Sequence, residues 1–367
     1  MLKSNFHVSY LFVILLCISL VTHTKACYDN HSKAALFVFG DSIFDVGNND
    51  YFPTTIRSNY FPYGETFFKY PTGRFSDGRL IPDFIAEYAK LPLIPPYLQP
   101  GFVEYTLGVN FASAGAGALT ETNLGSVIDL ITQLIYFKKV SLQLRQKPGD
   151  VEATTLLSRA VYFVNIGAND YLFIFQTNSP AIRSFSPEEF VRRVISNINF
   201  VIQEMYKIGG RKFALINIES LACIPFSRVL AAGKYNESCL DQITPYVQLH
   251  NMQLSKLLKK LNRDLIGFRY SLSDGHGFQK EITKFPSRYG IKELNVACCG
   301  SGPYKGIFNC GGRRIAKEYS LCVNIDEHIF FDSFHNTERV YQQFAEKAWS
   351  GKPNFEGSYN LKALFES

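Results

Sequence analysis

The chain contains short apolar runs that stop abruptly at glycine and polar residues. The clearest is residues 36–39 (Leu-Phe-Val-Phe), which are followed directly by Gly40-Asp41-Ser42. A strand buried on both faces of a parallel sheet has such an uninterrupted pattern. Open α/β sheets bind their ligands at the carboxyl ends of the strands, so Ser42 falls where a site is expected. Taken alone, the tripeptide is more often an ordinary turn, because all three residues favour turns.

Further segments repeat this pattern. Residues 161–164 are apolar and lead into the polar segment 165–170, and residues 213–218 form another run of the same kind. Residues 108–117 begin as a short strand and open into a loop of small residues. Helical patterns lie between these runs. This alternation predicts an α/β fold with a doubly wound, mostly parallel sheet flanked by helices.

Two of the helices have clear start signals. Ser186 is the expected N-cap of one, with Pro187 at the first helical position and Glu189 three residues after the cap. That helix is expected to close at Gly209-Gly210. Thr244-Pro245 is expected to open another helix in the same manner.

The chemical complement of Ser42 lies far along the chain, in Asp332-Ser333-Phe334-His335. A serine becomes nucleophilic only when a base takes its proton and a third group orients that base. Asp332 and His335 are three residues apart, so a helix or a tight turn directs both side chains to one side. The carboxylate then accepts from one imidazole nitrogen and leaves the other for Ser42. The same spacing is common by chance on protein surfaces. Thr337 is a possible N-cap for a helix over residues 339–349.

Two segments supply candidate donors for developing negative charge. The glycines of the small-residue loop let backbone N–H groups approach a reacting atom closely, and Asn169 carries a side-chain amide. Each feature has an ordinary alternative: a flexible turn for the loop, and a local cap for the asparagine.

In this order, the segments together resemble the GDSL esterase/lipase family of the SGNH hydrolases, in particular its plant branch. The resemblance covers essentially the whole mature chain and implies the three-layer α/β/α fold of SGNH hydrolases. The residues that carry it are Gly40 to Ser42 with Asp45, Gly47, Asn48 and Asn49, then residues 73–79, 110–117, 167–170 and 332–335.

The resemblance implies Ser42 as the nucleophile, His335 as the base and Asp332 as the residue that orients the base. The implied activity is hydrolysis of carboxylic esters through an acyl-enzyme on Ser42. Two alternatives stay open: an acyltransferase that passes the acyl group to an alcohol, and a catalytically idle binding protein on the same scaffold.

The resemblance also implies Gly115 and Asn169 as oxyanion donors, with Gly117 as an alternative to Gly115. The chain departs from the family pattern at two positions. Ile43 stands where leucine is usual, and Asn336 follows the histidine where proline is common. The second departure is expected to alter the start of the following helix.

The N-terminal residues 1–26 have the features of a signal peptide. Lys3 precedes an apolar stretch over residues 10–21, and Ala26 precedes the expected cleavage site. The stretch is short for a membrane span, and no later segment reaches the required length. We expect a secreted protein in which residues 27–367 form a single domain, because no linker, repeat or low-complexity boundary interrupts them.

Charge argues against a polyanionic partner. Loss of Lys3 and Lys25 with the leader lowers the formal net charge from +6 to +4, which does not indicate nucleic acid binding. Lys256, Lys259 and Lys260 alternate with leucines and are expected on the solvated face of a helix. The expected partner is a small-molecule ester, without stable membrane insertion; the oligomeric state is left open.

Cysteine usage fits an exported protein. Cys17 leaves with the leader, and Cys223 and Cys239 enclose a local loop that is expected to be bridged. A zinc site is the competing interpretation, but Cys-x-x-Cys pairs and histidine clusters are absent from the sequence, so no metal and no cofactor are expected. The sequons at Asn30 and Asn236 would be usable on the secretory route. Seven cysteines remain, an odd number: Cys27, Cys223, Cys239, Cys298, Cys299, Cys310 and Cys322.

Aromatic residues cluster at 60–63 (Tyr-Phe-Pro-Tyr) and 67–68 (Phe-Phe). They are candidates for the lining of an acyl site, and core packing is an equally good interpretation.

Overall fold

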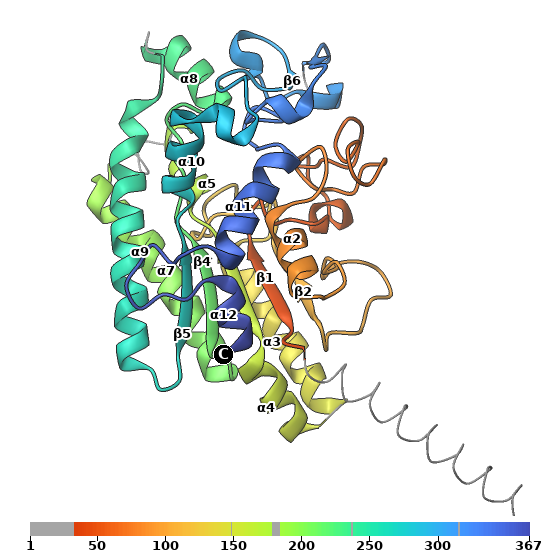
Figure 1. Ribbon diagram of the computed structural model, residues 1–367, viewed down its shortest axis with the longest axis vertical. Helices are drawn as coiled ribbons and strands as arrows, with labels where there is room; N and C mark the ends of the chain where they lie inside the picture. The colour runs from red at the N-terminus through yellow and green to blue at the C-terminus, as the bar shows by residue number, and fades with distance from the viewer. Residues whose placement is uncertain (1–32, 148, 178–183, 236–237, 315) are drawn as a thin grey trace, which may run out of the picture. The chain divides into compact units, whose positions relative to one another are not determined.

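The computed structural model describes residues 33–147, 149–177, 184–235, 238–314 and 316–367 (Figure 1). The predicted leader, Cys27 and both sequon asparagines lie outside these residues. A five-stranded sheet has the order β2-β1-β3-β4-β5, and all its neighbouring strands are parallel. This is the doubly wound arrangement expected from the sequence. The strands are β1 (Leu36–Gly40), β2 (Gly108–Asn110), β3 (Val161–Asn165), β4 (Lys212–Ile216) and β5 (Arg269–Ser273).

The centre of the sheet is the pair β1 and β3. They run in register from Leu36 opposite Val161 to Gly40 opposite Asn165. Every residue of β1 is buried, as its uninterrupted apolar run predicts. Gly40 has a φ of +153°, and a Cβ there would lie 2.3 Å from the carbonyl oxygen of Asn165. A side chain at position 40 would therefore push apart the two strand ends that carry the site.

Helices cover both faces of the sheet. In one group, α11 (Glu338–Ser350) contacts both α2 (Ile81–Tyr88) and α12 (Leu361–Glu366), and α12 also contacts β4 and β5. In a second group, α7 (Pro187–Ile208) packs against both α3 (Leu130–Gln146) and α9 (Thr244–Asp264). Right-handed crossovers put the two groups on opposite faces, and Figure 1 shows α11 and α12 in front of the sheet.

The other elements occupy the connections. They are α4 (Asp150–Arg159), α5 (Ala168–Gln176), α8 (Pro225–Tyr235), α10 (Gly275–Lys284), the antiparallel pair β6 (Cys299–Gly300) and β7 (Ser320–Leu321), and the 3₁₀ turns η1 (Asn48–Tyr51), η2 (Asp241–Ile243), η3 (Pro286–Tyr289), η4 (Pro303–Lys305), η5 (Cys310–Gly312) and η6 (Ile325–Glu327).

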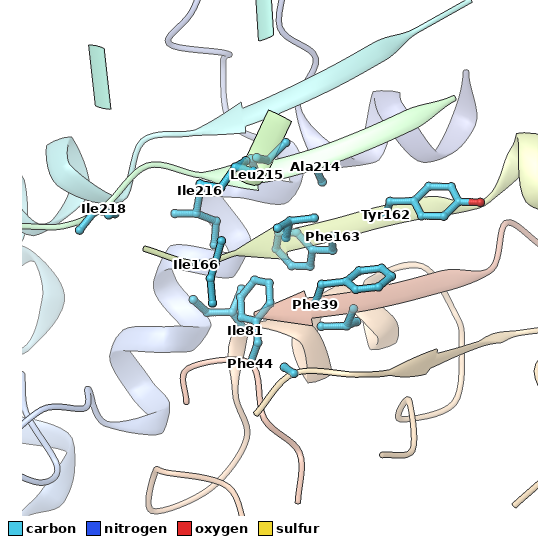
Figure 2. Packing of buried hydrophobic residues seen from close by; sticks show 14 of the residues in the cluster. Phe39, Phe44, Ile81, Tyr162, Phe163, Ile166, Ala214, Leu215, Ile216 and Ile218 are labelled. Carbon is cyan, nitrogen blue, oxygen red and sulfur yellow. The ribbon is translucent and has the colours of Figure 1, made fainter. Parts of the chain in front are cut away.

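The core lies between the sheet and these helices. Figure 2 shows side chains of β1, β3 and β4 meeting there, among them Phe39, Phe163 and Leu215. Phe44 joins them from the turn after β1, with its ring centroid 4.5 Å from that of Phe163. Removing a buried phenylalanine ring typically costs about 3–5 kcal/mol. Because Phe44 follows Ser42 by two positions, its burial anchors the turn on which Ser42 lies.

The helix-start predictions are confirmed for one helix and wrong in detail for the other. At α7, the Ser186 hydroxyl accepts from the Glu189 N–H at 3.2 Å, and the Glu189 carboxylate accepts from the Ser186 N–H at 3.0 Å. At α9, Thr244 is already helical and Ile243 is the N-cap, because η2 runs directly into the helix. The three lysines at 256, 259 and 260 lie exposed on α9, as predicted.

Candidate active site

Ser42 lies in the turn that follows β1. The Asp41 carbonyl accepts from the N–H groups of Phe44 and Asp45 at 3.1 and 2.9 Å, which closes the turn. The side-chain amide of Gln133 in α3 accepts from the Gly40 N–H and donates to the Gly40 carbonyl, both at 2.8 Å. The backbone N–H and carbonyl of Gly40, at the end of β1, therefore have hydrogen-bond partners in a helix side chain. A glutamine in the middle of a helix gives no sequence signal, and the sequence analysis missed it.

The segment after Ser42 is tied to the small-residue loop. The Asp45 carboxylate accepts three backbone N–H bonds, one of them from Ala114 at 2.9 Å. Asn48 and Asn49 donate their side-chain amides to carbonyls within residues 110–114, at 2.8 to 3.0 Å. These residues belong to the motif that follows the serine. Their contacts fix one candidate donor loop relative to the turn that carries Ser42.

The structure separates the two candidate glycines. Gly115 lines the cavity that also contains Ser42, and the Asn123 side chain donates to its carbonyl at 2.8 Å. Its φ is +82°, and a Cβ would lie 2.9 Å from the Ile56 side chain. Gly117 is instead buried outside the cavity wall, where a Cβ would lie 2.4 Å from the Asp170 carboxylate. Gly115 is therefore the one placed to meet a ligand.

Asn169 lies in the first turn of α5, directly after β3. Its side-chain nitrogen donates to the Ala116 carbonyl at 3.0 Å, which uses one of its two hydrogens and holds the amide against the loop. The adjacent Asp170 carboxylate is buried and accepts three hydrogen bonds from residues 118–122. Burial raises the pKa of Asp170 to about 6, opposed by these hydrogen bonds. Residues 41–49, 110–118 and 167–170 are called the strand-end loops below.

Asp332 and His335 meet in a tight turn, residues 330–336, called the base turn below. His335 Nδ1 donates to the Asp332 carboxylate, 2.7 Å from Oδ1 and 2.9 Å from Oδ2. The N–H groups of Phe334 and His335 donate to Oδ1 at 2.8 Å, and the Tyr63 hydroxyl donates to Oδ2 at 2.7 Å. Burial alone would raise the pKa of Asp332, but the His335 imidazole and these hydrogen bonds outweigh burial and lower it. Asp332 is thereby kept as an acceptor for the imidazole.

The cavity lining decides between the two interpretations of the aromatic segments. None of residues 60–63 or 67–68 lines the cavity, so the acyl-site interpretation is wrong. Phe61 points into solvent with 56% of its surface exposed. Phe67 covers the Arg79 guanidinium, which lies 3.9 Å from the ring centroid. Tyr63 is fully buried, and its role beside Asp332 was missed because the two residues are 269 positions apart.

A disulfide-bonded segment is attached to the base turn by backbone hydrogen bonds. The predicted Cys223–Cys239 bridge is confirmed, and the last four cysteines pair as Cys298–Cys322 and Cys299–Cys310. The N–H groups of Cys298 and Cys299 donate to the carbonyls of residues 330 and 331 at 2.9 and 2.7 Å. The bridged segment 298–322 is therefore attached directly in front of Asp332.

The helix after His335 starts as predicted despite the departure at Asn336. Thr337 is the N-cap of α11, although its hydroxyl donates to another loop and not to the helix. The Asp77 carboxylate accepts from the Glu338 N–H at 2.8 Å and thus caps the helix from a distant motif. Neither of these cap contacts involves position 336.

Four of the predicted residues, Ser42, Gly115, Asn169 and His335, line one cavity of about 330 Å³, with Asp332 directly behind His335. The rest of the wall is mainly apolar and includes Ile81, Phe278, Phe334 and Phe344. Across the described ranges, no group of three His, Cys, Asp or Glu residues is arranged to hold a metal ion. None of the helices described is both long enough and apolar enough to span a bilayer.

A parallel sheet flanked by helices, with these side chains around a cavity beyond its strand ends, is the arrangement of the SGNH class of α/β hydrolases. Residues 36–348 match the family model "GDSL-like Lipase/Acylhydrolase", and the chain belongs to this family.

Named relatives agree with the family model. The chain is 52% identical over 349 residues to GDSL esterase/lipase 1 and 50% identical over 351 residues to GDSL esterase/lipase 2, both of Arabidopsis thaliana, covering 93% of each chain. It is 46% identical over 356 residues to a GDSL lipase of Tanacetum cinerariifolium, covering 96% of this chain and 93% of the relative. The protein is a carboxylic ester hydrolase.

Proposed function

We propose that the hydrolase works through an acyl-enzyme on Ser42. His335 takes the Ser42 hydroxyl proton while Oγ bonds to the ester carbon, and it returns that proton to the alcohol as the ester C–O bond breaks. Water then attacks the acyl carbon, His335 takes a proton from the water, and Ser42 leaves with that proton. Asp332 fixes the imidazole with its Nδ1 protonated, so that Nε2 is the acceptor in each step.

In this proposal, the Gly115 N–H and the Asn169 side chain bind the oxygen that becomes negatively charged in each tetrahedral intermediate. Both residues line the cavity with Ser42, and both are held by hydrogen bonds to neighbouring loops. Donors fixed before the reaction stabilise the developing charge without reorganisation.

The observation that supports the mechanism most strongly is the Asp332–His335 pair, bonded at 2.7 Å, with His335 in the same cavity wall as Ser42. Ser42→Ala is expected to abolish ester turnover and labelling by a serine-directed phosphonate while leaving the melting temperature near that of the wild type. A folded variant that keeps most of its activity and its label would contradict the proposal. Product analysis with an added alcohol distinguishes hydrolysis from acyl transfer.

We also propose that the protein is secreted as residues 27–367, a single domain. The apolar leader with Ala26 at its end and the three disulfide bonds support export, because such bonds persist in oxidising compartments. N-terminal sequencing of extracellular protein is expected to begin at Cys27; a start at Met1 would contradict the proposal.

A further inference from the structure

The cavity wall contains a carboxyl group that the mechanism above does not use. Glu219 follows β4 and lines the cavity together with Ser42 and His335. The side-chain nitrogen of Asn336, the residue after His335, donates to Glu219 Oε2 at 3.4 Å. This hydrogen bond therefore links the base turn to the segment that follows β4.

Asn336 makes a second contact that a proline at this position cannot make. Its backbone N–H donates to the Tyr341 hydroxyl of α11 at 3.2 Å, and its side chain is only 8% exposed. Proline has neither a backbone N–H nor a side-chain amide. The departure from the family pattern thus adds two hydrogen bonds beside His335, and one of them ends on Glu219.

Burial and neighbouring charges shift the pKa values of the ionisable groups around Glu219 and Asn336. Burial raises the pKa of Glu219 to about 6, while the Asn336 hydrogen bond and the charge of His335 lower it. Burial, opposed by the Ile43 backbone hydrogen bond and assisted by the charges of Asp170 and Glu219, raises the pKa of Asp41, in the turn after β1, to about 7. Tyr341 on α11 has its pKa raised well above 10 by burial and stays neutral. The Asn336 hydrogen bond and the charge of His335 thus favour the ionised form of Glu219 against its burial.

We propose that Glu219, held by Asn336, is a positioning residue that stabilises the protonated imidazole of His335 from the cavity side. The inference rests on the proposed function, in which His335 is protonated between the two halves of each transfer. Asp332 stabilises that cation at Nδ1. A second carboxylate in the same low-dielectric wall favours the charged imidazole further and holds the turn through Asn336.

The test is the pH profile of kcat/KM for a soluble ester, with active sites titrated by a serine-reactive inhibitor. Glu219→Gln keeps an oxygen for Asn336 but removes the charge. Without that charge the imidazole releases its proton at lower pH, so the acid limb is expected to move down by roughly 0.5–1 pH unit. We expect kcat to fall about three- to tenfold with little change in KM. Glu219→Asp retains the charge and is expected to keep the limb close to that of the wild type.

Asp41 needs a control, because loss of Glu219 also lowers the pKa of its carboxyl. The Glu219→Gln shift is therefore repeated in an Asp41→Asn background, where it is expected to persist; its disappearance there would assign it to Asp41 and overturn the inference. If Glu219→Gln does not fold, Asn336→Pro removes the link and leaves the carboxyl, with a smaller shift expected in the same direction. An unmoved limb in a folded variant overturns the inference. Wild-type protein without ester turnover or Ser42 labelling would instead overturn the proposed function.

Discussion

Ser42 and His335 line one cavity, yet their surroundings differ. Ser42 lies at the end of a fully buried strand, among strand-end loops held by backbone and amide hydrogen bonds. His335 lies in the base turn, outside the sheet, where a tyrosine from a distant segment and a disulfide-bonded segment support it. The sheet itself positions the first region. The second region lies outside that sheet, so the Tyr63 hydrogen bond and backbone hydrogen bonds from the disulfide-bonded segment position it.

The largest effect is expected on the strand-end side. In the proposed mechanism, Asn169→Ala removes a donor to charge that develops only in the transition state, so kcat is expected to fall by about 10²–10³ with little change in KM. Turnover per titrated site and thermal unfolding are measured together. Asn123→Ala is the matched control, because it loses one hydrogen bond to Gly115 without touching the reacting oxygen. Near-normal kcat in folded Asn169→Ala would make Asn169 structural only.

On the base side, replacing both Cys299 and Cys310 by serine is expected to cost about 2–4 kcal/mol of unfolding free energy. It should also lower kcat per site, because the Cys299 N–H bonds the carbonyl of residue 331, next to Asp332. Serine replacement of Cys223 and Cys239 is the stability control, with a comparable loss of unfolding free energy. Wild-type kcat per titrated site in the folded Cys299→Ser, Cys310→Ser variant would show that the bridged segment does not support the base turn.

The smallest of these three expected effects concerns a single hydroxyl, that of Tyr63. Tyr63→Phe removes the donor to Asp332 Oδ2, and a hydrogen bond to a charged group contributes about 1.5–3 kcal/mol. We expect kcat to fall roughly tenfold. Tyr60→Phe is a close control: its ring packs against Tyr63, and its buried hydroxyl has no hydrogen-bond partner among the described residues. Similar kinetics for the two variants would remove Tyr63 from the support of Asp332.

The sequence predicted the fold well where one segment carries its own signal. Residues 36–39 and 161–164 are apolar without interruption because neighbouring strands and both helix layers bury them. The Ser186 capping box could also be predicted from a single segment, because its donors and acceptors are three residues apart. Thr244 shows the limit: its pattern is that of a cap, but the preceding 3₁₀ turn moves the helix start by one residue.

Contacts around the cavity were predicted where the residues are close in sequence and missed where they are far apart. Asp332 and His335 share one turn, so their spacing pointed to the pair. Gln133 acts on Gly40 across 93 positions, and no local pattern marks it. Glu219 follows a strand like the other site residues, but a single glutamate after an apolar run is common. The choice between Gly115 and Gly117 required coordinates, because both glycines lie in the same small-residue loop.

The hydrogen bond between Tyr63 and Asp332 has a consequence for the timing of biosynthesis. Its two ends are 269 positions apart. Chains emerge N-terminus first, at about 5–20 residues per second. Ser42 and Tyr63 therefore leave the ribosome well before the base turn. In the proposed mechanism, a nascent chain that has not yet released the base turn carries Ser42 without its base, so ester turnover waits until both segments have been made and have folded together.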